Sequence, residues 1–120
     1  MASNISGVGA PDLSTGFPRS GRELLGGYAW LARLADKVRA EHAGTQGDYI
    51  GYCPMSMSYL NATGVTRDEF DKLVAGGASD DDLVNYFDEH VSAEKKASSN
   101  ALVLEDGASH LDAQDAEEGR

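Results

Sequence analysis

The sequence predicts an all-α fold, in a single small domain of four or five helices. Apolar side chains recur at helical spacing, three segments carry capping-box pairs that mark helix starts, and no segment alternates as a half-buried strand does. A chain of 120 residues has room for one modest core. We expect a flexible lead-in over residues 1–16, a helical domain over 17–97 and an acidic flexible tail over 98–120.

The first predicted helix covers residues 24–43. Ser20 precedes it with an acidic residue three positions later, which is capping-box spacing, and Gly44 suits a left-handed end. Two glycines, Gly26 and Gly27, interrupt the pattern, so either the helix begins at Gly27 or another part of the chain lies close there. One face of this helix carries Leu24, Tyr28, Leu31, Leu34, Ala35, Val38 and His42.

Three shorter helices follow. The segment 55–62 comes directly after a proline, which suits the first position of a helix. A helix over 67–75 is expected from the capping box at Thr66, and one over 80–92 from the box at Ser79. Three aspartates in the first turn of the last helix are placed where the helix dipole favours negative charge.

The two ends of the chain have a different composition. Residues 98–120 hold six carboxylates against one arginine, and their one apolar cluster is 101–104. Such a charge density predicts a flexible tail that adds almost nothing to the melting temperature. The alternative is that 101–104 docks against the core. Residues 1–16, rich in glycine and serine, predict an extended lead-in.

Charge and motifs exclude several classes of protein. A net charge of -10 disfavours binding to nucleic acid or to an anionic membrane surface. No apolar run has the length of a membrane span, and residues 1–16 do not resemble a signal peptide, so we expect a cytoplasmic protein. A lone cysteine and three dispersed histidines predict no metal site, and the absence of nucleotide or catalytic motifs predicts no cofactor.

One cluster of polar residues is a candidate ligand site. Basic groups on and just before the first helix could converge with a phenol and a thiol from the glycine-rich loop after it. Such a cluster suits a small anionic ligand, with an aspartate to orient a cation. The candidates are Arg19, Arg33, Asp36, Lys37, Arg39, Tyr49 and Cys53.

The alternative is that these charges only form ion pairs. Arg33 and Arg39 would then pair with Asp36, Asp48 or carboxylates in the acidic second half of the chain, and Lys37 with Glu41 four residues on. For Cys53 we favour a buried, inert cysteine over a nucleophile, because no histidine lies near it in sequence.

Two function classes follow. We favour a noncatalytic interaction or regulatory module with a protein partner, since the chain is small and has no recognisable catalytic set. The alternative is a binder of, or an enzyme acting on, a small anionic ligand. A pocket in which the candidate residues converge would favour the second class, and their dispersal into ion pairs the first. The sequence does not indicate an oligomeric state.

A string of short motifs runs along the first three quarters of the chain. The motifs are Pro18-Arg19-Ser20, Gly26-Gly27-Tyr28, Ala32-Arg33, Asp36-Lys37, Arg39-Ala40, Ala43-Gly44, Gly47, Tyr49, Cys53-Pro54 and Ala78-Ser79-Asp80. This string resembles a small bacterial domain family of unknown function, over about residues 11–91. The resemblance implies these domain limits and no activity, substrate or cofactor. Here Met55 and Ser56 follow Cys53-Pro54, where the family carries a leucine and an acid.

Overall fold

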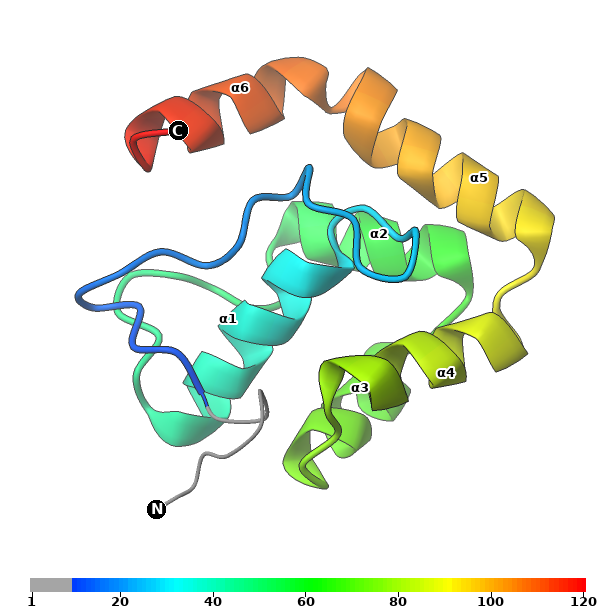
Figure 1. Ribbon diagram of the computed structural model, residues 1–120, viewed down its shortest axis with the longest axis horizontal. Helices are drawn as coiled ribbons and strands as arrows, with labels where there is room; N and C mark the ends of the chain where they lie inside the picture. Colours follow the sequence, from blue (N-terminus) through cyan, green and yellow to red (C-terminus); the bar gives the residue numbers. More distant parts are fainter. Residues whose placement is uncertain (1–9) are drawn as a thin grey trace.

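The computed structural model describes residues 10–120, which fold into six α-helices and one π-helical turn, with no β-strand among them. In Figure 1, α1 lies in the middle beside α2, with α3 and α4 at lower right and α5 and α6 along the top. The all-α prediction is confirmed, although its count of four or five helices is too low. The elements are α1 (Leu31–Ala43), α2 (Pro54–Thr63), α3 (Arg67–Ala75), α4 (Asp80–His90), α5 (Ala93–Ala101), η1 (Leu102–Asp106) and α6 (Ala108–Glu117).

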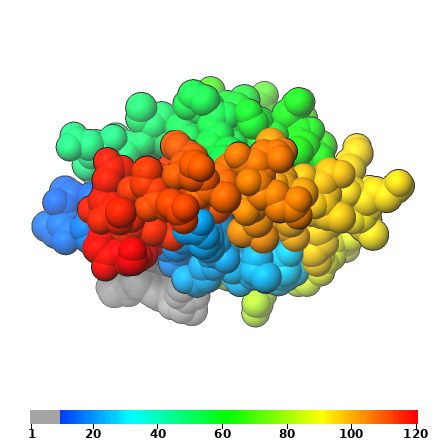
Figure 2. Space-filling view, turned by 90° about the horizontal axis from the view of Figure 1, so that it is seen from above, coloured from blue at the N-terminus to red at the C-terminus, as the bar shows by residue number. Residues whose placement is uncertain are grey.

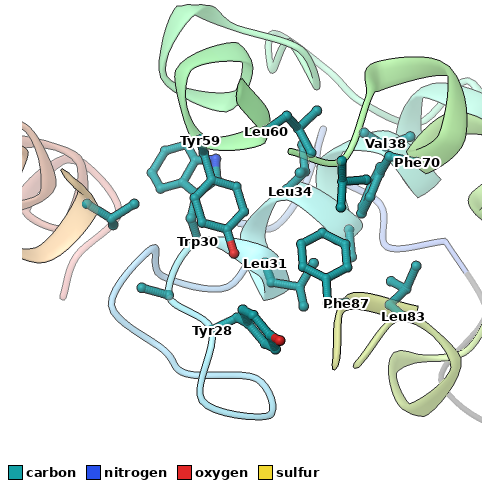
Figure 3. Close-up of a cluster of buried hydrophobic side chains, with 14 of the residues drawn as sticks. Tyr28, Trp30, Leu31, Leu34, Val38, Tyr59, Leu60, Phe70, Leu83 and Phe87 are labelled. Carbon is teal, nitrogen blue, oxygen red and sulfur yellow. The ribbon is translucent and has the colours of Figure 1, made fainter. Parts of the chain in front are cut away.

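The core forms where α1 to α4 meet. Phe87 contacts Tyr28 and Phe70 edge to face, with ring centroids 5.3 and 6.2 Å apart. Tyr59 of α2 and Trp30 close the other side of this core (Figure 3). Aromatic side chains from four segments thus fix the helices around α1. No helix in residues 10–120 is long and apolar enough to cross a membrane.

The start of α1 differs from the prediction. The helix begins at Leu31, because the preceding residues form a tight loop in which Leu25 and Tyr28 exchange two backbone hydrogen bonds. Gly26 has a φ of 60°, and any side chain there would overlap Val84 of α4. Another element therefore does approach this glycine closely. Trp30 also has positive φ and is fully buried.

The capping boxes predicted at Thr66 and Ser79 are confirmed, with both reciprocal hydrogen bonds present in each. The box predicted at Ser20 is wrong. Its hydroxyl accepts a hydrogen bond from the Arg22 amide and donates one to Asp115. Ser20 thus joins the N-terminal half of the domain to α6.

The flexible tail expected over 98–120 is also wrong. Val103 and Leu111 are fully buried in the core, and α5 packs against α2. Three of the six carboxylates have partners far away in the sequence, since Arg22 pairs with both Asp112 and Asp115 and Arg33 pairs with Glu118. Figure 2 shows the orange to red C-terminal segment running across one face, between the green and the blue to cyan parts of the chain. High charge density does not prevent folding here, because half of the carboxylates are paired and the segment also buries apolar side chains.

The expected lead-in is ordered where the structure describes it. Leu13 is buried, and its amide donates to the carbonyl of Thr45 at 2.8 Å. The Thr45 hydroxyl donates in turn to the carbonyl of Pro11. Residues 10–16 therefore pack against the loop after α1, which corrects the expectation for that part. Residues 1–9 lie outside the described range.

Replacement of Leu111 tests whether the C-terminal segment belongs to the core. Leu111→Ala is expected to lower the free energy of unfolding by about 2–5 kcal/mol and the melting temperature by at least about 5 °C. The matched control is Leu104→Ala, whose side chain is 37% exposed on the same segment and should cost far less. Thermal unfolding followed by circular dichroism measures both, and equal small effects would show that the segment is not docked.

Candidate functional site

A pocket of about 740 Å³ opens between α1, the start of α2, the loop that joins them and α6. Its wall combines buried charged groups with apolar side chains at the rim. Both halves of the chain are needed to form it, because four of its lining residues come from the C-terminal segment. The lining residues are Phe17, Arg33, Lys37, Asp48, Tyr49, Ile50, Cys53, Pro54, Met55, His110, Gln114, Glu117 and Glu118.

The two cations of the pocket come from one face of α1. Arg33 and Lys37 lie one helical turn apart, and both side chains are almost completely buried. The indole of Trp30 lies beneath them, with its ring centroid 5.7 Å from the guanidinium carbon and 5.4 Å from the ammonium nitrogen. Their positive charges are therefore held in a poorly solvated place.

Arg33 is neutralised by a carboxylate from the other end of the chain. Its Nη1 and Nη2 donate to Oε1 and Oε2 of Glu118 at 2.9 and 2.7 Å, and both residues are buried. The Tyr49 hydroxyl donates to Oε2 at 2.7 Å. Burial acts to raise the pKa of Glu118, but hydrogen bonds from Arg33 and Tyr49 outweigh it and hold the pKa below its ordinary value. Burial and the bond to Glu118 raise the pKa of Tyr49 to about 12, so the phenol remains a donor.

Lys37 has no carboxylate partner within 4 Å among residues 10–120. Its Nζ donates to Sγ of Cys53 at 3.3 Å. The partner expected from helical spacing, Glu41, accepts instead from the amide of Gly51 at 2.9 Å. Burial lowers the pKa of the Lys37 ammonium, partly opposed by the nearby thiol.

Cys53 is the N-cap of α2 and contacts a second polar group, the hydroxyl of Ser56, at 3.4 Å. That hydroxyl oxygen accepts a hydrogen bond from the indole N–H of Trp30 at 3.1 Å. Burial acts to raise the pKa of the Cys53 thiol, but Ser56 and Lys37 together hold the pKa below its ordinary value. The sulfur thus lies among donors.

The other three predicted site residues lie outside the pocket, in an ion-pair network. Arg19 pairs with Asp36 at 3.0 Å and with Asp80 at 2.9 Å, while Arg39 pairs with Asp80 at 2.8 Å. This network ties α1 to the first turn of α4 and leaves no cation there without a carboxylate. The predicted cluster therefore divides, with Arg33, Lys37, Tyr49 and Cys53 lining the pocket.

The part of the site that follows residue 100 was not predicted from the sequence. Glu118, His110 and Gln114 fall in the segment expected to be a flexible tail. One signal was available, because the first 50 residues hold five of the ten basic residues and the remaining 70 hold 15 of the 20 acidic ones. That asymmetry suits pairing between the two parts of the chain, without indicating which carboxylate would meet Arg33.

Glu118→Gln tests the buried pair. The change leaves the Arg33 guanidinium without a counter-charge and should cost roughly 3 kcal/mol at neutral pH. Because folding depresses the pKa of Glu118, the stability it contributes is present above the ordinary glutamate pKa of about 4.3 and is lost as pH falls through the folded value. The difference from wild type should therefore shrink in acid.

Chemical denaturation between neutral and acidic pH measures this difference. The control is Glu117→Gln, which changes an exposed neighbour on the same pocket wall and should have little effect. A Glu118→Gln variant as stable as the control at neutral pH would contradict the assignment.

The sequence matches the model of a protein family described as a domain of unknown function (DUF5069), over residues 15–117. No curated protein matches the chain. The match agrees with the resemblance seen in the sequence and extends it past residue 91 through the C-terminal helices. It thus includes nearly all of the pocket wall. The chain belongs to the DUF5069 family, whose description assigns no function.

Proposed function

We propose that the protein binds a small organic anion with a single negative charge in the pocket beside α1. The observation that supports this is the buried Lys37 ammonium, which lines the pocket with a thiol, a weak acceptor, as its hydrogen-bond partner. A buried charge is costly unless a partner compensates it. The arginines near it each have a carboxylate, which leaves Lys37 as the cation suited to a ligand.

The other charges of the pocket limit the ligand to one negative charge. Glu118 already compensates Arg33, and Asp48 and Glu117 also line the wall. A nucleotide or sugar phosphate would bring several negative charges close to these carboxylates, at a cost that a single ammonium does not offset. A monocarboxylate avoids most of this repulsion.

The rim of the pocket suits an apolar ligand body. Phe17 and Ile50 are 54% and 63% exposed, although both are large hydrophobic residues. Together with Met55 they line the same pocket, and the cavity volume of about 740 Å³ lies within the range of small-molecule sites. An aliphatic or aromatic carboxylic acid would cover these side chains while its carboxylate reaches Lys37.

The interaction module predicted from the sequence is the second candidate. Exposed Phe17 and Ile50 would also suit an apolar side chain of a protein partner, which is the observation that favours it. The bacterial origin and the cytoplasmic location expected from the sequence likewise stay predictions.

A thermal-shift series tests the ligand proposal. Hexanoate and benzoate are expected to raise the melting temperature by several degrees at high occupancy, since ligand at 100 times its dissociation constant adds about 2.7 kcal/mol. Hexanamide, which lacks the charge, and adipate, which carries two, should shift it much less. Lys37→Met should abolish the shift, because it removes the cation that the ligand carboxylate reaches.

The control variant is Lys72→Met, which removes an exposed lysine on α3 and should keep the shift. An equal response of wild type and Lys37→Met to hexanoate, or no response to either monocarboxylate, would contradict the proposed site. Specific co-purification of a protein whose binding Phe17→Ser or Ile50→Ser weakens would favour the interaction module instead.

A further inference from the structure

We propose that Cys53 is held as a thiolate in the unliganded pocket and is a nucleophile that forms mixed disulfides with small uncharged disulfides. This reverses the interpretation of Cys53 as an inert cysteine. The inference uses the same pocket as the proposed function but needs no bound anion. It rests on the groups around the sulfur, on the charge balance of Lys37 and on access from the pocket.

Two donors and a helix start converge on the sulfur. The Lys37 ammonium lies 3.3 Å from Sγ, and Cys53 occupies the N-cap position of α2, where the helix dipole favours negative charge. The Ser56 hydroxyl lies 3.4 Å away. Because the indole N–H of Trp30 can only donate, it uses the serine oxygen as an acceptor and leaves the hydroxyl proton free to point at the sulfur.

The charge balance of Lys37 favours the same state of the sulfur. Its side chain is 3% exposed, and in the described part of the chain its hydrogen bond goes to Cys53 alone. A thiolate at that position supplies the counter-charge that a buried ammonium needs, whereas a neutral thiol does not. The sulfur thus takes the role that Glu118 has for Arg33.

Some of the remaining charged groups of the pocket favour a thiolate at Cys53, and others oppose it. Arg33 on α1 favours a thiolate but is compensated by Glu118, while Asp48 on the loop and Glu117 on α6 oppose it. His110 on α6 also faces the cavity. The ammonium in direct contact with the sulfur outweighs the rim carboxylates. Because the thiolate already balances Lys37, a reagent with its own negative charge would meet the rim carboxylates without compensation, so small uncharged disulfides are the suited reagents.

Access to the sulfur comes from the open side of the pocket. Cys53 is half-buried and lines the cavity, whereas Lys37 and Ser56, which contact the sulfur, are almost fully buried. A small disulfide that enters the pocket can therefore reach Sγ without unfolding the helix. Since the chain has a single cysteine, no second thiol of the same chain can displace the adduct.

The reaction is a thiol–disulfide exchange. The Cys53 thiolate attacks one sulfur of the small disulfide, a new S–S bond forms, and the original S–S bond breaks. The departing thiolate takes a proton from water, so one disulfide replaces another with no net oxidation. An external thiol reverses the step, which makes Cys53 a site of reversible modification.

The test measures the rate at which the full chain reacts with 2-hydroxyethyl disulfide, over a range of pH values. Mass spectrometry of the intact protein follows formation of the mixed disulfide. Wild type should reach half its maximal rate at a pH below the ordinary cysteine pKa of about 8.5. For the same chain in denaturant, the pH of half-maximal rate should return to the ordinary cysteine pKa. Lys37→Met and Ser56→Ala should move the midpoint upward, whereas Lys72→Met should leave it unchanged.

A folded wild type whose midpoint equals that of the denatured chain would overturn the inference, and so would a midpoint that Lys37→Met does not move. The denatured wild type keeps the test decisive even if a variant fails to fold. Neither hexanoate nor benzoate is added in this experiment, so its result is independent of the thermal-shift series. A low midpoint without hexanoate binding would support the thiolate and reject the proposed ligand.

Discussion

The buried pair between Arg33 and Glu118 is the constraint on which the rest of the structure depends. It joins the first helix to the end of the chain across 85 residues, and neither partner reaches solvent freely. An arginine on the inner face of α1 requires a counter-charge that this helix does not supply. The acidic C-terminal segment supplies it, and its docking buries Val103 and Leu111 against the core.

The same pair defines the chemistry of the pocket. With Arg33 compensated, its neighbour Lys37 lies one turn away with a sulfur as its hydrogen-bond partner. The proposed monoanion and the proposed thiolate are two ways to balance one buried ammonium, so they compete. A bound carboxylate would favour the protonated, unreactive thiol, which would couple occupancy of the pocket to the reactivity of Cys53.

Local signals in the sequence predicted the middle of the fold well. Capping boxes at Thr66 and Ser79 depend on residues three positions apart, and both form as expected. The start of α1 could not be predicted in this way, because contact between Gly26 and Val84 of α4 decides it. The C-terminal helices were missed for a related reason, since their carboxylates pair with arginines about 90 residues away. The sequence left open whether the candidate residues converge or disperse into ion pairs. Arg33, Lys37, Tyr49 and Cys53 line one pocket, whereas Arg19, Asp36 and Arg39 form ion pairs, and the contact between Arg33 and Glu118 depends on the tertiary fold.

A double-mutant cycle on Arg33 and Glu118 tests the central claim most directly. Arg33→Met and Glu118→Leu each remove one charge, and the double variant removes both. If the pair holds the C-terminal segment to α1, each single change should destabilise strongly and the double variant should recover much of the loss, with a coupling of about 2–3 kcal/mol in the free energy of unfolding. Additive effects of the two changes would contradict the account.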